Sequence, residues 1–275
     1  MQDSHYLHGT HPEEQARLTT LNQLLNERSL AQMVPRPGER ILDMGSGLGQ
    51  FTRMMARTAG RGRVLGIERS EEQIAEALRQ ARADGEEDLV EFRRGNVYDP
   101  PLDDSEWGTF DLAHARFVLE HVPEPLRVVQ TMVRAVRAGG RIVLEDDDHD
   151  LLRLYPDCPG FAELWTAYTR SFDRLGNDPF VGRRLVSLLH RAGARHTRTT
   201  MLHFGGSAAH PHWPGLTHNI AYIIDQARPV ILQHDLLEEE ALDAGLDSFR
   251  SWTQRPDATV WYATMWAEGV LLPQS

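Results

Sequence analysis

The sequence is poor in cysteine, in long apolar runs and in excess positive charge. Cys158 is the only cysteine in 275 residues, which excludes an internal disulfide and a cluster of metal-bound thiolates. No apolar run is long enough to span a bilayer, and the start, MQDSHYLHGTHPEEQ, lacks the basic-then-apolar layout of a secretory signal. A net charge of −11 argues against a broad basic surface for nucleic acid. We therefore expect a cytoplasmic protein that binds neither nucleic acid nor a membrane.

Short apolar runs alternate with helical patterns between Arg40 and Asp150. The runs RILDM, RVLGIE, LVEFRRG, FDLAHA and GRIVLED are typical of strands, and amphipathic segments separate most of them. Ser70 is a natural N-cap for the helix SEEQIAEALRQARA, with Gln73 at the capping-box position. Strands that alternate with helices indicate an α/β fold with a parallel sheet covered on both faces.

The pattern changes after Asp150. Phe161, Trp165, Tyr168 and Phe172 recur at helical spacing, and such a stripe belongs more often to a core than to a substrate site. Further helices are expected at LTHNIAYIIDQA and EEEALDAGLDSFRSW, with a last strand in ATVWYATMWAEG. We predict a single domain in four parts: an N-terminal helical cap (1–37), a cofactor-binding core (38–150), a helical lid insertion (151–192) and a segment that completes the sheet (193–275).

The stretch ILDMGSGLGQ places three glycines directly after an apolar run. Gly45, Gly47 and Gly49 would let a ligand approach the backbone closely, and ligands of open parallel sheets bind beyond the carboxyl ends of the strands. The spacing G-x-G-x-G differs from the dinucleotide fingerprint G-x-G-x-x-G. A carboxylate at Asp43 would repel a pyrophosphate and attract a cationic ligand. These features disfavour a nicotinamide oxidoreductase.

Five ordered motifs carry a family resemblance. The segments LDMGSGLGQF, GIERS, RGNVYDPP, FDLAHARFVLEHVPEP and RAGGRIVLEDDD resemble those of class I S-adenosylmethionine-dependent methyltransferases, over residues 40–150. The segment YLHGTHPEEQARL resembles the N-terminal helix of the bacterial small-molecule, natural-product branch. The resemblance implies a Rossmann-like doubly wound, mostly parallel seven-stranded sheet and S-adenosyl-L-methionine as cofactor. Asn96 departs from the pattern, because an acid is usual there.

The resemblance also implies a set of cofactor-binding residues. Glu68, at the end of the second strand, would hold the ribose hydroxyls, although a solvated strand-end acid is the alternative. Asn96 would either contact the adenine or cap a turn. The full expected set is Asp43, Gly45, Ser46, Gly47, Gln50, Glu68, Arg69, Gln73, Gly95, Asn96, Val97, Arg116 and Phe117.

Methyl transfer requires alignment of the acceptor and, for a hydroxyl or a protonated amine, sometimes a base. The candidate catalytic residues are His121, Asp146 and His149, with a purely structural histidine as the alternative for His121. The run EDDDHD offers carboxylate ligands for a hard cation. Since no third ligand is evident elsewhere, we expect no metal.

Residues of the second half of the chain are expected to line the acceptor site. The histidines of HFGGSAAHPHWPGLTH fit a pocket-lining loop better than a zinc site. The expected substrate and lid residues are Tyr6, Trp165, Tyr168, His203, His212 and Trp213.

The sequence therefore predicts a methyltransferase that acts on oxygen or nitrogen of a small-molecule acceptor. The alternative is a regulatory or non-methylating protein that keeps the cofactor pocket. DLAHAR stands where N-P-P-[YFW] marks methylation of adenine amino groups, and the acidic balance disfavours RNA, so nucleic acid is not the expected acceptor. A homodimer is compatible with these features.

Overall fold

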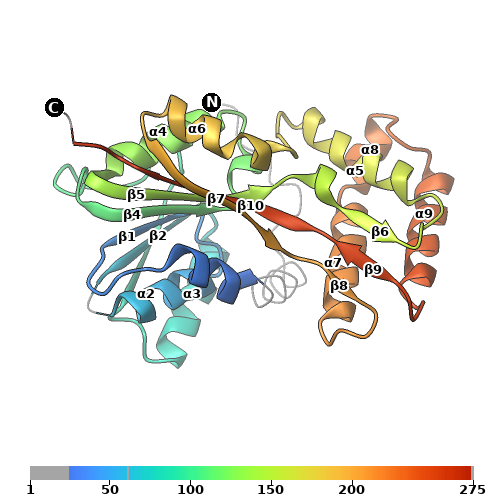
Figure 1. Ribbon diagram of the computed structural model, residues 1–275, viewed down its shortest axis with the longest axis horizontal. Coiled ribbons are helices and arrows are strands. Elements are labelled where there is room, and N and C mark those ends of the chain that lie inside the picture. Colours follow the sequence, from blue (N-terminus) through green and yellow to red (C-terminus); the bar gives the residue numbers. More distant parts are fainter. Residues whose placement is uncertain (1–24, 61, 274–275) are drawn as a thin grey trace.

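A seven-stranded sheet forms the centre of the molecule (Figure 1). The computed structural model describes residues 25–60 and 62–273. The sheet has the order β3-β2-β1-β4-β5-β10-β7, in which the first five strands are parallel and β10 runs antiparallel to both its neighbours. Its strands are β1 Ile41–Met44, β2 Val64–Glu68, β3 Val90–Arg94, β4 Phe110–Arg116, β5 Val136–Asp147, β7 Arg195–His203 and β10 Ala263–Val270. The prediction of a doubly wound, mostly parallel seven-stranded sheet is confirmed.

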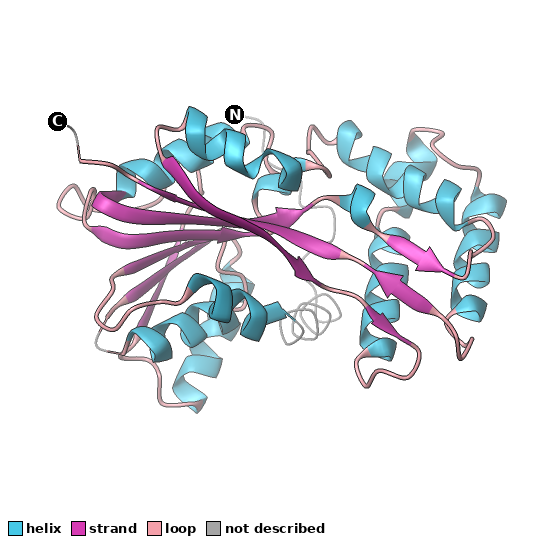
Figure 2. Ribbon diagram, viewed as in Figure 1, coloured by secondary structure: helices cyan, strands magenta, loops and turns pink. Residues whose placement is uncertain are grey.

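Helices cover both faces of this sheet (Figure 2). One face packs under α2 (Gln50–Ala59) and the helical residues 25–33, with a core that includes Met33, Met55 and Trp266. The other packs under α4 (Pro125–Ala135) and α6 (Leu185–Arg191). The helix α3 (Glu71–Ala83) begins at the expected N-cap, because the Ser70 hydroxyl accepts a hydrogen bond from the amide of Gln73 at 3.3 Å.

A second, smaller unit follows the carboxyl end of β5 and is called here the small subdomain, residues 152–174 and 204–262. Its three-stranded antiparallel sheet has the order β6-β9-β8. Helices α5, α7, α8 and α9 pack together beside it around a separate apolar core (Figure 1). Its elements are β6 Arg153–Tyr155, α5 Phe161–Arg174, β8 Gly206–Ser207, α7 Trp213–Gln226, α8 Arg228–Gln233, α9 Glu239–Trp252 and β9 Thr259–Trp261.

The small subdomain differs from the insertion expected at 151–192. After α5 the chain passes through the 3-10 helix η3 (Val181–Arg184) into α6, which packs on β7 and β10 of the main sheet. The partners of α5 lie instead about 50 to 90 residues further along, in α7 to α9. The expected segment therefore divides between two units, and the aromatic stripe Phe161, Tyr168 and Phe172 is buried in the core of one of them.

Of the expected N-terminal cap, only residues 25–37 lie in the described part of the chain, and Tyr6 lies outside it. Helical residues 25–33 are tied to the main sheet by two arginines: Arg116 donates to Asn26 Oδ1 at 2.8 Å, and Arg141 donates to the Met33 carbonyl at 2.8 Å. Within the described ranges, no helix has both the length and the apolar character needed to cross a membrane.

Candidate cofactor and acceptor site

The glycine loop joins β1 to α2 and adopts a backbone that favours glycine. Gly45, Gly47 and Gly49 have φ values of 76°, 54° and 68°, in the left-handed region. A Cβ atom on Gly45 would lie 2.5 Å from Cγ2 of Val118, which follows β4. The amide of Gly45 donates to the Ile67 carbonyl at 2.8 Å. The loop is thus held at the carboxyl ends of β2, β1 and β4.

The carboxylate of Glu68 connects this loop with the start of α3. Its Oε2 accepts from the amide of Gly47 at 3.0 Å, and its Oε1 accepts from the amides of Arg69 and Ser70 at 2.8 and 2.9 Å. These bonds hold an acceptor-rich group at the rim of the loop, where the ribose acid is expected. A role in the ribose contact stays a prediction.

Asp43 is 3% exposed and faces the protein interior. One oxygen accepts from the Thr52 hydroxyl at 2.6 Å, and the other lies 2.8 Å from Nδ1 of His114. Asp43 therefore joins β1 to α2 and β4. The expectation that it attracts a cationic ligand directly is not supported, because both oxygens are engaged by buried groups of the protein.

The remaining predicted cofactor residues of the first half lie around the ends of β2 and β3. The Asn96 side chain accepts from the amide of Tyr98 at 2.9 Å, so the turn-capping alternative is realised. Gly95 packs against Pro101, since a Cβ there would lie 2.3 Å from Cδ of that proline. Val97 and Gln50 are half-buried, Gln73 is buried below Gly47, and Arg69 is exposed.

Ser46 supplies a test of whether this loop fits the cofactor that the sequence implies. Its hydroxyl is buried and has no hydrogen-bond partner, although it lies in a loop lined by backbone amides. Together with the open glycine backbone and the Glu68 carboxylate, this unused polar group fits a ligand that carries several hydroxyl and amine groups. The residues present are therefore compatible with the cofactor that the sequence implies.

Arg116 ends β4 and Phe117 follows it, next to the helical residues 25–33. The guanidinium of Arg116 lies 4.4 Å above the ring of Phe51. Burial lowers the pKa of Arg116, and the nearby carboxylates of Glu145 and Asp43 oppose this shift. Phe117 has a φ of 54°, which is unfavourable for a residue with a side chain. Strain of this kind concentrates at functional sites.

Asp146 holds the chain that follows β4. It is fully buried, and it accepts from the amides of Val118 and Leu119 at 3.1 and 2.8 Å and from that of Asp147 at 3.1 Å. Burial, followed by the charge of Glu120, raises its pKa well above the usual value. Its side chain is used to position backbone, and a role for Asp146 facing an acceptor stays a prediction.

His149, in the 3-10 helix η2 (His149–Leu151), is the centre of a buried polar network. Its Nε2 lies 3.1 Å from Oε2 of Glu120, and its Nδ1 lies 2.9 Å from the hydroxyl of Tyr262. The rings of Trp165 and Tyr168 pack edge-on against the imidazole at 5.4 and 5.5 Å. Burial lowers the pKa of His149, which favours the neutral imidazole near neutral pH.

His121 joins the same network from the 3-10 helix η1 (Leu119–His121). Its Nε2 lies 3.4 Å from Oε1 of Glu120, and its ring stacks on Phe172 at 5.9 Å. The structure therefore brings two of the three predicted catalytic residues together. Sequence reasoning missed Glu120 and Tyr262. The neighbouring letters of LEHV were a signal for Glu120, but nothing local marked Tyr262.

Ligand-type atoms of Glu120, Asp147 and His149 all lie within 4.8 Å of one another. Similar sets of carboxylate and imidazole groups bind divalent metal ions in proteins. Here, however, both ring nitrogens of His149 already have hydrogen-bonding partners of normal length. We therefore treat the set as a hydrogen-bonded network.

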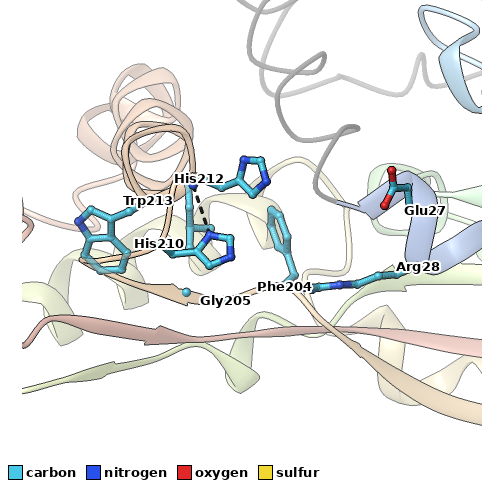
Figure 3. A pocket seen from close by; sticks show the side chains of 9 residues that line it. Glu27, Arg28, Phe204, Gly205, His210, His212 and Trp213 are labelled. Carbon is cyan, nitrogen blue, oxygen red and sulfur yellow. Dashed lines mark hydrogen bonds between the residues drawn. The ribbon is translucent and has the colours of Figure 1, made fainter.

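A cavity of about 180 Å³ opens between the helical residues 25–33 and the small subdomain (Figure 3). Two of the predicted substrate residues, His212 and Trp213, line it. Its full lining is Glu27, Arg28, Phe204, Gly205, Gly206, His210, His212, Trp213 and Leu216. His210 Nδ1 accepts from the amide of His212 at 3.3 Å, so this nitrogen is used within the loop.

Phe204 lines the cavity and also contacts Tyr262 of the polar network. The amide of Phe204 donates to the Tyr262 carbonyl at 2.7 Å, and the two rings lie 5.9 Å apart. The other predicted substrate residues lie elsewhere. His203 packs on Trp261 at 5.8 Å, while Trp165 and Tyr168 belong to the core of the small subdomain.

Comparison with known proteins identifies the class. Residues 42–144 match the family model described as a methyltransferase domain. With the strand order above and the glycine loop at the end of β1, this part of the chain is a methyltransferase domain of the class I S-adenosylmethionine-dependent type.

Individual relatives agree with this class. The 27-O-demethylrifamycin SV methyltransferase of Amycolatopsis mediterranei (strain S699) is 36% identical over 140 residues, 50% of this chain and 50% of that protein. The chain spans about half the length of most of the curated relatives it matches.

Two solved structures show the same fold at low identity. The [4+2]-cyclase SpnF has a TM-score of 0.58 at 20% identity and covers 91% of this chain and 81% of its own. A geranyl diphosphate methyltransferase in complex with SAM has a TM-score of 0.56 at 18% identity, with coverages of 94% and 88%.

Proposed function

We propose that this protein is an S-adenosylmethionine-dependent methyltransferase that acts on oxygen or nitrogen of a small-molecule acceptor. One juxtaposition carries the proposal. The glycine loop and Glu68 lie at the carboxyl ends of β1 and β2, and the His149 network lies beyond the neighbouring ends of β4 and β5. A ligand held by the loop would therefore lie next to groups able to bind and deprotonate an acceptor.

The residues of the loop would hold the cofactor in distinct ways. The glycines admit its approach to the backbone, the Ser46 hydroxyl offers an unused donor and acceptor, and Glu68 offers carboxylate oxygens. S-adenosylmethionine supplies an electrophilic methyl group on a sulfonium. The protein then has to align the acceptor and exclude water. The small subdomain, with its buried aromatic side chains, is suited to exclude water.

A small acceptor is supported by the lining of a nearby cavity. The cavity of about 180 Å³ lies between the helical residues 25–33 and the small subdomain, and Phe204 and Trp213 give it an apolar wall. Most ligand pockets share this pattern of apolar walls with a few polar groups. The rifamycin relative and the small-molecule neighbours support the same class of acceptor.

A second candidate is a protein that binds the cofactor without transferring the methyl group. The fold also occurs in a [4+2]-cyclase, and a fold does not fix an activity. Methyl transfer to an acceptor distinguishes the two, because a non-methylating protein would bind the cofactor and transfer nothing.

The test combines binding with turnover. Titration calorimetry with the demethylated cofactor product, S-adenosylhomocysteine, should detect binding to the parent protein. It should detect none to Gly47→Val, because a φ of 54° strains any residue with a Cβ. Mass spectrometry should then detect one added methyl group in a panel of small alcohols, phenols and amines. Absence of binding at high micromolar product would reject the proposal, and binding without transfer would favour the second candidate.

A further inference from the structure

A chain of four polar side chains crosses the boundary between the main sheet and the small subdomain. Glu120 contacts His149 at 3.1 Å, and His149 contacts the Tyr262 hydroxyl at 2.9 Å. At longer range the same hydroxyl interacts with the carboxylate of Asp147, the last residue of β5. Asp147 and His149 are two residues apart, whereas Glu120 and Tyr262 come from distant segments, so only the fold brings the set together.

The hydrogen bonds of this network limit the protonation states that its four side chains can adopt together. A neutral imidazole donates from one nitrogen and accepts at the other. If Nδ1 of His149 carries the hydrogen, it donates to Tyr262, which leaves the hydrogen of Tyr262 free to turn toward Asp147, and Glu120 must be protonated to donate to Nε2. If Nε2 carries the hydrogen, it donates to Glu120, Tyr262 donates to Nδ1, and Asp147 carries the proton. In both states one carboxyl group is protonated and the other is ionised.

The electrostatics of the set agree with a single shared charge. Burial raises the pKa of Asp147 well above its usual value, and the charges of Glu120 and Asp146 raise it further. His149 and the hydroxyl of Tyr262 oppose this rise. Two carboxylates this close and this buried cannot both ionise without a large cost. These directions are consistent with one negative charge shared along the chain.

Asp147 is the member of this set that has a carboxylate oxygen without a partner. Glu120, His149 and Tyr262 are 4%, 3% and 7% exposed, whereas Asp147 is only partly buried. Its Oδ1 lacks a hydrogen-bond donor at normal distance. Asp147 ends β5, and Val118 at the end of the adjacent β4 packs against Gly45 of the glycine loop. A buried carboxylate oxygen without a hydrogen-bond partner thus lies at the end of the sheet that also carries the glycine loop.

We propose that Asp147 takes the proton of an acceptor hydroxyl, assisted by Tyr262, His149 and Glu120, so that the acceptor is an alcohol or a phenol. The inference rests on the proposed function and narrows it. The acceptor oxygen forms a bond to the methyl carbon, and the sulfur keeps the electron pair of the broken carbon–sulfur bond. The hydroxyl proton moves to Asp147. Asp147 is then the catalytic residue, and the other three are positioning residues.

The chemistry of the acceptor explains why the network favours a hydroxyl. A neutral amine attacks with its own lone pair and loses a proton afterwards, so it gains little from a base. An unperturbed phenol has a pKa of about 10 and is mostly protonated at neutral pH. Its oxygen becomes a good nucleophile only as the proton leaves, which general bases accelerate by roughly 10²–10⁴-fold.

The first test measures turnover with paired acceptors, phenols and anilines of the same carbon skeleton. Asp147→Asn and Tyr262→Phe should lower kcat for the phenols about 10²-fold or more, with little change in KM. The matched control is Tyr98→Phe, which removes a hydroxyl that accepts from the Glu124 amide at 3.0 Å, away from the network. The control should retain the parent kcat.

The pH profile adds a readout that a purely structural role would not produce. Tyr262 lowers the pKa of Asp147 and Glu120 raises it. Tyr262→Phe should therefore move the acidic limb of kcat/KM to higher pH, and Glu120→Gln should move it to lower pH. The other titratable groups near Asp147 are His121, Asp146, Asp148, His149, Asp150 and Tyr168. If the acidic limbs of the two variants' pH profiles move in the same direction, or do not move, the inference is contradicted.

A spectroscopic test needs no turnover. The infrared band of a protonated carboxyl group should be present in the parent near neutral pH and reduced in both Glu120→Gln and Asp147→Asn, because either change leaves one unopposed carboxylate. The pKa of Asp146 depends on the charge of Glu120, so the same comparison in an Asp146→Asn background removes the contribution of Asp146. Difference spectra that show only ionised carboxylates in the parent would overturn the shared charge.

The outcomes separate this inference from the proposed function. Failure to bind S-adenosylhomocysteine, or failure to methylate any acceptor, sinks both. If the protein methylates only anilines, and Tyr262→Phe does so at the parent rate, the proposed role of Asp147 and its network is rejected. The proposed methyltransferase function is then unaffected. Loss of turnover with a chelator and recovery with Mg²⁺ or Zn²⁺ would assign Glu120, Asp147 and His149 to a metal ion and overturn the proton transfer.

Discussion

At the scale of single residues, Glu68 combines a structural task with an expected binding task. Three backbone amides donate to its carboxylate, one from the glycine loop and two from the start of α3. A ligand bound at this rim would find those oxygens already oriented. Orientation in advance lowers the ordering cost of binding. Glu68, at the end of β2, therefore helps to shape the cofactor site even when no cofactor is bound.

We predict that Glu68→Ala weakens the binding of S-adenosylhomocysteine roughly ten- to hundredfold, because hydrogen bonds to a charged acceptor are worth about 1.5–3 kcal/mol. Titration calorimetry measures this. Glu71→Ala is the matched control, since Glu71 is an exposed acid at the start of α3, three positions further on, and pairs with Arg94 at the surface. Glu68→Gln, which keeps an acceptor oxygen, should bind more tightly than Glu68→Ala. Parent-like binding by Glu68→Ala would remove Glu68 from the site.

The sequence alone predicts those features of the site that depend on residues close together in the chain. The glycine loop and the Ser70 cap are local patterns, and the structure has both. Asp146 and Asp147 differ by one position, and a pattern cannot tell which of them the end of β5 turns inward. Tyr262 lies 113 positions from His149, and its contact depends on how β9 and β10 cross between the two units. Contacts between residues so far apart in the chain can be identified only from the three-dimensional structure.

At the scale of elements, the loop from β4 into η1 depends on one buried side chain. Asp146 accepts three backbone hydrogen bonds, two of them from Val118 and Leu119. Val118 also fills the space beside Gly45. The position of Glu120, two residues further on, follows from the same contacts. Asp146 thus fixes one wall of the cofactor loop and one end of the polar network.

We predict that Asp146→Asn destabilises the protein by about 1–3 kcal/mol, because an amide offers one acceptor oxygen where the carboxylate uses two. The folded pKa of Asp146 is raised, so its protonation stabilises the folded state below the usual value of 3.8, and this contribution is lost as pH rises through the folded pKa. The difference between parent and variant should therefore shrink from about pH 5 to about pH 8.

Urea unfolding at both pH values measures this difference. Asp150→Asn is the matched control, because Asp150 is exposed and its ion pair with Arg183 is worth little. An Asp146→Asn protein as stable as the parent at both values would show that the three hydrogen bonds do not hold the loop.

The elements also show why the lid boundaries were hard to predict. α6 is amphipathic like α5, and a helical pattern does not say which sheet or core a helix covers. Leu185, Leu188 and Leu189 of α6 pack with the main sheet, while Leu164 and Phe172 of α5 pack with α7 and α9. The sequence predicted each helix correctly as a helix. Assigning the partners required long-range contacts.

At the scale of the whole molecule, the small subdomain is joined to the main sheet by a few chain crossings. The chain leaves β5 at 148–152, returns at 175–180, leaves β7 at 203–205 and returns through 262 into β10. α5 cannot move by itself, because Phe161 and Phe249 pack at 5.0 Å and the surrounding core is buried. A motion that closes the acceptor site would therefore move the small subdomain as one body, bending at the crossings.

We predict such a closure when S-adenosylhomocysteine and an acceptor bind together. Methyl transfer benefits from the exclusion of water, and closing motions of this kind often limit turnover. Hydrogen exchange with the product alone, and with product plus acceptor, should show added protection at the glycine loop with the first ligand and at the four crossings with the second. Amides inside α5 should already be protected without ligand, because this helix belongs to a formed core. If protection rises only around Gly45 to Gln50 and Glu68, the small subdomain is a fixed wall, and the acceptor must enter through the cavity beside Phe204 without closure.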